Sequence, residues 1–143
     1  MTELIEKVAK WLEQMNLKII RVEDESRIIV NYQITDYVFQ VQLLSSESWI
    51  NAKALVANTK DLSETELLQL YRSVLIANWE LNEVTFSVDP DNGNIWVETD
   101  MPIDTSFENF EVEITSIPFG IKHFLDKIAP KLSFEIRDTS YVE

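Results

Sequence analysis

Three segments in the first half of the chain alternate apolar and polar residues with a period of two. The apolar positions are Ile28, Val30, Tyr32 and Ile34, then Tyr37, Phe39, Val41 and Leu43, then Ile50, Ala52, Ala54 and Val56. This period is typical of strands with one buried face. The polar clusters between the segments are too short for crossover helices, so neighbouring strands must be antiparallel. The pattern predicts a three-stranded meander and leaves open a short lead-in strand at residues 18–22.

A second pair of strands is expected further along the chain. Apolar residues alternate through Val84, Phe86 and Val88 and again at Ile95 and Val97, with Asp-Pro-Asp-Asn-Gly between them. This composition is typical of a tight turn, so the segment predicts a β-hairpin.

Two segments show the helical period clearly. The first carries one apolar stripe and ends near Asn16; the stripe is Leu4, Val8, Trp11, Leu12 and Met15. The second follows a capping box of Ser63 and Glu66 and runs to about Trp79. Its apolar residues surround most of the cylinder, with the main stripe at Leu67, Leu70, Tyr71, Val74 and Leu75. Such a helix is expected to be buried on most sides.

Residues 104–129 allow two interpretations. One helical stripe continues across Pro118, through Phe107, Phe110, Ile114, Ile117, Ile121, Leu125 and Ile128. Residues 110–114 alternate as a strand would. We favour the helix because its stripe is longer, with a kink expected at Pro118 and an end at Pro130. Residues 130–143 are then a tail with a weak strand pattern at 134–136.

These elements predict an α+β fold in one domain, residues 1–143. Its core is an antiparallel five-stranded sheet with helices packed on it, in the order α-β-β-β-α-β-β-α. A chain of 143 residues is long enough to bury a core without disulfides or a structural metal.

The charge distribution restricts the partners. The chain has a formal net charge of −13, and the 49 residues between Arg72 and Lys122 hold ten carboxylates but no Lys or Arg. With no basic cluster in the sequence, we expect no binding to nucleic acid or anionic membrane. The absence of a signal segment and of a long apolar run predicts a cytoplasmic, soluble protein.

No catalytic, cofactor or metal signature is found. The chain has no cysteine and one histidine, His123, expected to be a solvated helix residue. Asp89, Asp91 and Gly93 lack the spacing of a calcium loop and are better explained by the turn. The sequence therefore predicts no enzyme and no cofactor.

Two groups of apolar residues are candidate interaction sites. Trp49, Leu55 and Trp96 fall on the polar side of their strands, so we expect them to bind a partner unless another segment covers them. Leu68, Ile76 and Trp79 extend beyond the main stripe of their helix, so we expect a homodimer interface there. The competing explanation is that the helix of residues 104–129 covers them within a monomer.

The order of elements resembles the type III secretion chaperone-like fold, and within it the bacterial family of putative sensory-transduction regulators. The segments that carry the resemblance are residues 67–84, the turn at 89–93, residues 97–100 and residues 105–110, and Leu75-Ile76-Ala77-Asn78-Trp79 is similar to the family's helix-to-strand corner. The resemblance implies a small acidic protein that dimerises and binds other polypeptides.

The expected function is therefore an acidic, chaperone-like or regulatory module that binds a protein or peptide. The alternative is a small-molecule sensor or a hydrolase, and it would require an enclosed pocket with convergent polar groups.

Overall fold

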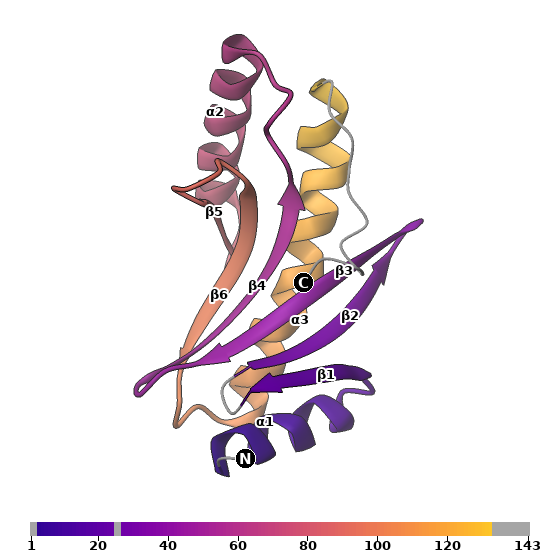
Figure 1. Cartoon of the computed structure of the whole chain (residues 1–143), viewed down its shortest axis with the longest axis vertical. Coiled ribbons are helices and arrows are strands. Elements are labelled where there is room, and N and C mark those ends of the chain that lie inside the picture. Colours follow the sequence, from indigo (N-terminus) through magenta and orange to yellow (C-terminus); the bar gives the residue numbers. More distant parts are fainter. Residues whose placement is uncertain (1–2, 25–26, 133–143) are drawn as a thin grey trace.

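The computed structural model describes residues 3–24 and 27–132, which form three α-helices and six strands (Figure 1). The helices are α1 (Glu3–Gln14), α2 (Glu64–Glu80) and α3 (Phe107–His123). The strands are β1 (Ile19–Asp24), β2 (Arg27–Ile34), β3 (Tyr37–Ser45), β4 (Trp49–Ala57), β5 (Thr85–Val88) and β6 (Ile95–Pro102). A π-helical turn (Phe124–Ile128) and a 3-10 turn (Ala129–Lys131) continue the chain beyond α3.

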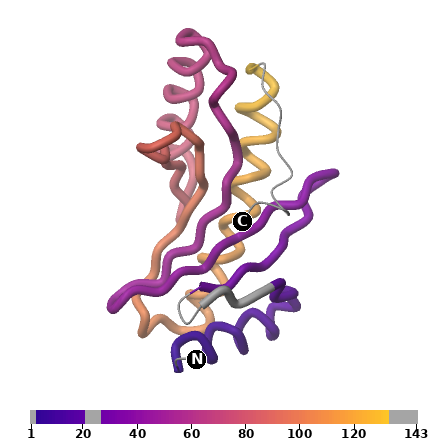
Figure 2. The backbone as a smooth tube through the Cα atoms, viewed as in Figure 1, coloured from indigo at the N-terminus to yellow at the C-terminus, as the bar shows by residue number. Residues whose placement is uncertain are grey.

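All strands belong to one antiparallel sheet in the order β1-β2-β3-β4-β6-β5. β4 and β6 lie side by side although α2 and β5 separate them in the sequence (Figure 2). The predicted α+β class and antiparallel pairing are confirmed. The strand count of five is wrong by one, because the lead-in segment forms β1, which pairs with β2 through two register shifts.

The alternating residues form the buried face of the sheet, as predicted. Val30, Phe39, Val41, Ala52 and Ala54 are fully buried in one apolar cluster, which also contains residues of all three helices. Period-two alternation therefore placed the core correctly on β2, β3 and β4.

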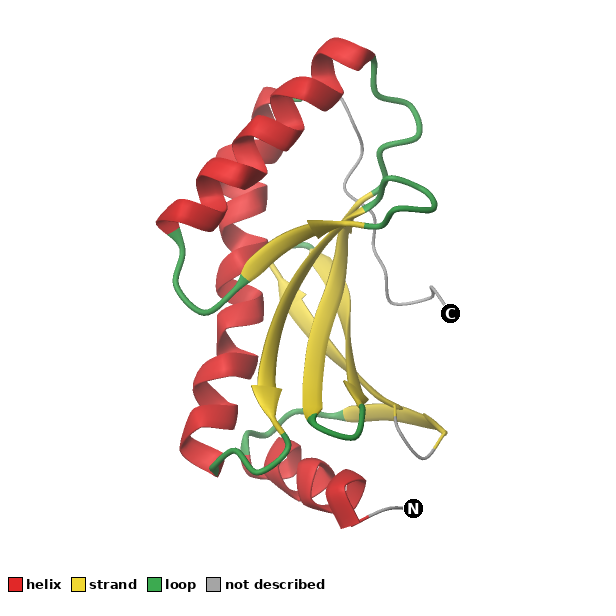
Figure 3. Cartoon of the chain, turned by 90° about the vertical axis from the view of Figure 1, so that its left-hand side faces the viewer, coloured by secondary structure: helices red, strands yellow, loops and turns green. Residues whose placement is uncertain are grey.

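The helices cover that face unequally. Figure 3 shows α2 and α3 on the same side of the sheet, with α1 at one end. α3 packs against β6, β4 and β2, and its Phe110, Ile114, Ile117 and Ile121 have no exposed surface. The helical interpretation of residues 110–114 is confirmed, and α3 continues through Pro118. Its regular part ends at His123, before the predicted end at 129.

The local signals at helix ends and turns also hold. Asn16 has φ +58°, which ends α1 in the left-handed region. Gly93 has φ +77°, and its N–H donates to the Asp89 carbonyl over 2.8 Å. The Asp91 N–H donates to the Asp89 carboxylate over 2.9 Å, so this side chain serves the β5–β6 turn.

No helix in the described part of the chain is long and apolar enough to cross a membrane. The strand pattern at residues 134–136 lies outside the described residues.

Candidate functional site

α2 is fixed at its start by the predicted capping box. The Glu66 N–H donates to the Ser63 hydroxyl over 3.2 Å, and the Ser63 N–H donates to the Glu66 carboxylate over 3.4 Å. Only Leu70, Val74 and Ala77 of this helix are buried. They face the core beside β5 and the π turn, the elements against which α2 mainly packs.

Asn78 fastens the end of α2 to the edge of the sheet. Its side-chain oxygen accepts from the Phe86 N–H over 2.7 Å, and its amide donates to the Phe86 carbonyl over 3.2 Å. β5 is an edge strand, so these two bonds satisfy backbone groups that no neighbouring strand pairs. The same attachment fixes which side of α2 points outward.

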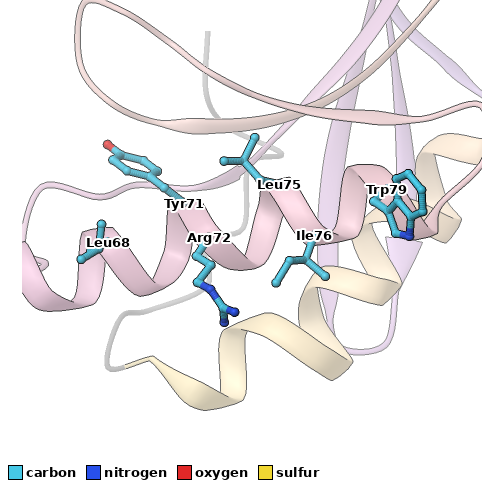
Figure 4. A pocket seen from close by; sticks show the side chains of 6 residues that line it. All are labelled: Leu68, Tyr71, Arg72, Leu75, Ile76 and Trp79. Atoms are coloured by element: carbon cyan, nitrogen blue, oxygen red, sulfur yellow. The ribbon is translucent and has the colours of Figure 1, made fainter.

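The outward side of α2 is an apolar surface, which we call the α2 face. It consists of Leu68, Tyr71, Arg72, Leu75, Ile76 and Trp79 around a shallow hollow of about 620 Å³ (Figure 4). The exposed fractions are 72% for Leu68, 68% for Leu75, 41% for Ile76 and 89% for Trp79. Isolated apolar side chains are common on surfaces, whereas a contiguous group of them is a candidate interaction site.

Two sequence expectations about this helix need correction. α2 is not buried on most sides, and Leu75 points outward instead of into the core. The reason is that α2 packs mainly against the edge strand and the π turn, so a narrow stripe of the helix is buried. Leu68, Ile76 and Trp79 lie outside the core as expected, and α3 does not cover them.

A second apolar hollow was not foreseen from the sequence. It is an open groove of about 880 Å³ between the end of α1, Tyr32 of β2, the α2–β5 corner and α3, and we call it the α3 groove. Val112 and Phe119 line it and are 54% and 68% exposed. Both lie off the buried stripe of α3, and this position in the sequence pattern could have indicated that they are exposed. Glu83 and Glu111 also line it, and no Lys or Arg does.

A carboxyl group is buried just behind this groove. The Thr99 hydroxyl donates to the carboxylate of Glu113, which is 8% exposed. Burial, followed by a side-chain hydrogen bond with Glu83, raises the pKa of Glu113 to about 7, although the Thr99 bond opposes the shift. The nearby charges of Glu83 and Asp100 act in the same direction as burial. Glu113 therefore holds its proton at a higher pH than an ordinary glutamate does.

The strand residues predicted to bind a partner do not form one patch. Trp49 is 52% exposed at the start of β4, whereas Leu55 is only 6% exposed and lies opposite Trp96 of β6. Six residues along a strand span about 20 Å. Trp96 is half-buried, with the Lys53 ammonium 5.0 Å from its ring. Leu55 is thus too deeply buried to contact a partner.

Within residues 3–24 and 27–132, no three His, Asp or Glu side chains are grouped so that they could hold a metal ion.

The sequence matches one family model, YbjN, described as "Putative bacterial sensory transduction regulator", over residues 4–118. No curated protein sequence matches the chain significantly.

Several solved structures are similar to this one. An uncharacterized protein from Methanothermobacter thermautotrophicus is 18% identical, with a TM-score of 0.65 over 90% of this chain and 99% of that chain. YbjN from E. coli, described as a putative transcription regulator, is 16% identical, with a TM-score of 0.59 over 90% of this chain and 93% of that one.

A chain of the ExsC–ExsE complex is also similar, at 16% identity and a TM-score of 0.61 over 89% of this chain and 97% of that one. At these identities the likeness establishes the fold alone. That fold is type III secretion chaperone-like, as the sequence predicted.

Proposed function

We propose that this chain, which belongs to the family of putative bacterial sensory transduction regulators, binds other polypeptides without catalysis and pairs with a second copy of itself. The observation that supports the proposal is the α2 face, where Leu68, Leu75, Ile76 and Trp79 are exposed side by side. The chaperone-like fold is consistent with it, because one similar structure is described as a chaperone–effector complex.

Self-association is the simplest way to cover the α2 face. A two-fold axis beside the helix would bring the same side chains of two copies together, so that each surface complements itself. Burying a large apolar side chain contributes about 1.5–3 kcal/mol. Four such side chains in each copy therefore offer enough apolar surface to offset the entropy lost on association.

The α3 groove is the better site for a client polypeptide. Val112 and Phe119 offer apolar contact, and the carboxylates of Glu83 and Glu111 favour a segment that combines apolar with Lys or Arg residues. Trp49 is a further candidate contact at the far end of β4. The groove is open, so it suits an extended or helical peptide. A small-molecule sensor or a hydrolase would require an enclosed pocket instead.

Light scattering of the purified chain tests the dimer. We expect a dimer for the wild type and folded monomers for Ile76→Glu, because a carboxylate in the middle of the α2 face would be desolvated on association. Val112→Glu is the matched control, since it places the same charge on an exposed apolar position of α3. A wild-type monomer of 16.7 kDa at tens of micromolar would contradict the proposed dimer.

Affinity capture from the native host, followed by mass spectrometry, tests the client site. Three baits are compared: wild type, Ile76→Glu and Phe119→Glu. A client should be retained by Ile76→Glu and lost from Phe119→Glu. Proteins captured equally by all three baits are background, and finding only such proteins would contradict the groove assignment.

A further inference from the structure

The fold brings together basic side chains that lie far apart in the sequence. Arg72 of α2 lines a small pocket of about 320 Å³ with His123, Lys127 and Lys131 from the end of α3 and the turns that follow it. One carboxylate, Glu80, is also at the pocket. Three permanent cations and the only histidine thus converge in a chain whose net charge is −13. This corrects the expectation that the protein has no basic cluster.

Among the described residues, the cations of this pocket, Arg72, Lys127 and Lys131, form no ion pair with a carboxylate. The neighbouring carboxylate of Asp126 is already paired, since it accepts from the Lys122 ammonium over 2.7 Å. Like charges held around one hollow repel each other, and an anion between them relieves that repulsion.

Helix electrostatics explains only part of the cluster. His123 is the last residue of α3, and Lys127 and Lys131 lie in the turns that continue it. Cations at the C-terminal end of a helical segment compensate its partial negative charge. Arg72 belongs to the middle of a different helix. Figure 4 shows its guanidinium extending away from Tyr71 and Leu75 toward the C-terminal turns of the chain. Arg72 therefore adds charge that compensation of the α3 end does not require.

The side chains suit a tetrahedral oxyanion. A guanidinium offers a planar pair of N–H donors to two oxygens, and ammonium groups act as point charges beside it. The pocket has the volume of a small ligand site. A polyanion is disfavoured, because the net charge of −13 repels each added phosphate.

We propose that this pocket binds a small phosphate-bearing anion through Arg72, Lys127, Lys131 and His123. The proposal rests neither on a client nor on a dimer, although the pocket shares Arg72 and Ile76 with the α2 face.

Because His123 is the only histidine, its ring resonances report on this pocket alone. The experiment is an NMR titration of the full chain with inorganic phosphate, with chloride adjusted to keep the ionic strength constant. We expect the His123 signals to move and saturate. Arg72→Gln and Lys127→Gln should each weaken phosphate about tenfold, because each removes one charge-assisted contact.

Lys60→Gln is the matched control, because it removes one positive charge from an exposed loop outside the pocket. It should leave the phosphate titration unchanged. A shift that does not saturate, or an equal weakening by Lys60→Gln, would overturn the proposal and indicate general screening only.

Two further ligands define what is recognised. If adenosine monophosphate and inorganic phosphate bind with equal affinity, the pocket recognises the phosphate group alone. If adenosine monophosphate binds more tightly, the pocket also accepts the nucleoside. A single-stranded DNA oligonucleotide should bind more weakly than phosphate per site. Tighter binding of the DNA would overturn the assignment to a small anion.

Discussion

α2 and α3 have the same length of 17 residues, yet the fold uses them in opposite ways. α3 crosses the middle of the sheet and buries seven residues, including Phe110 and Ile117. α2 buries three, and it leaves Leu75 and Trp79 mostly in solvent. Both sequences are rich in apolar residues. An apolar stripe in the sequence of a helix therefore does not tell whether that side of the helix is buried within the same chain or left exposed.

The difference follows from where each helix meets the sheet. α3 packs mainly against β6, β4 and β2, which are central strands, whereas α2 packs mainly against the edge strand β5 and the π turn. A helix at an edge has room for a second partner on its free side. α3 therefore has a structural role, and α2 combines a structural side with a side that is available for binding.

The largest predicted contrast is between Phe110→Ala and Trp79→Ala, both made in the Ile76→Glu background to remove self-association. Phe110→Ala should lower the free energy of unfolding by about 3–5 kcal/mol, because it leaves a cavity beside Trp11, whose ring centroid is 5.0 Å away. Trp79→Ala should change it by less than about 0.5 kcal/mol. Urea unfolding measures both. Equal losses would show that Trp79 is covered within the monomer.

Should Phe110→Ala fail to fold, Ile114→Val gives the same comparison on a smaller scale, with an expected loss of about 0.5–1.5 kcal/mol.

Gly120→Ala tests how closely α3 approaches the sheet. The added methyl carbon would lie 2.8 Å from a Val97 methyl and 3.2 Å from both Val84 methyls, so the helix must shift. We expect a loss of about 1–3 kcal/mol from overpacking, although alanine is the better helix former. Thermal unfolding measures it, with Ser73→Ala on α2 as the control of small effect. A more stable Gly120→Ala protein would mean that α3 packs loosely.

Glu113→Gln should alter the pH dependence of stability. The pKa of Glu113 in the folded protein is about 7, above its ordinary value of 4.5, so the folded state holds this proton more tightly than the unfolded state. Stability from this group is therefore lost as pH rises from 4.5 to 7, by at most about 1.4 kcal/mol per pH unit. Glu113→Gln should gain stability relative to the wild type across that interval.

The measurement is chemical unfolding at pH 5 and at pH 8, with Glu111→Gln on the exposed side of α3 as the control. An identical pH dependence in wild type and Glu113→Gln would refute the raised pKa of Glu113.

The smallest contrast concerns the two N-caps. Ser63 and Ser106 each accept a backbone N–H three residues ahead, over 3.2 and 3.1 Å, so replacement by Ala should cost about 1 kcal/mol in either helix. The consequence should differ. We expect hydrogen exchange to accelerate only in the first turn of α2 for Ser63→Ala, and uniformly for Ser106→Ala, because α3 unfolds only with the core. Local fraying in both helices would remove the distinction.

The sequence predicted the parts of the fold that depend on local pattern. Alternation placed Val30, Val41 and Ala52 in the core, and Ser63 with Glu66 marked the start of α2. β1 was left open because its pairing with β2 is irregular, so no clean alternation marks it.

The parts that depend on long-range packing were less predictable. Leu75 was assigned to the core, because helical period alone cannot distinguish two neighbouring stripes. Strand alternation alone predicts that Leu55 is exposed. The pairing of Leu55 with Trp96, which lies 41 residues later in the chain, cannot be seen from this local pattern. Arg72 and Lys127 were not connected at all, since only the packing of α2 beside the end of α3 brings them to one pocket.

That packing has a thermodynamic consequence. Arg72 and Ile76 line both the hollow of the α2 face and the basic pocket, so the two sites share a wall. An anion in the basic pocket and a second copy on the α2 face, both proposed above, would each contact Arg72 and Ile76, and the coupling between two such equilibria is reciprocal. An anion that strengthens association of the α2 face must bind more tightly to the associated form, and by the same factor. The associated fraction of the protein would then rise with either the protein concentration or the anion concentration.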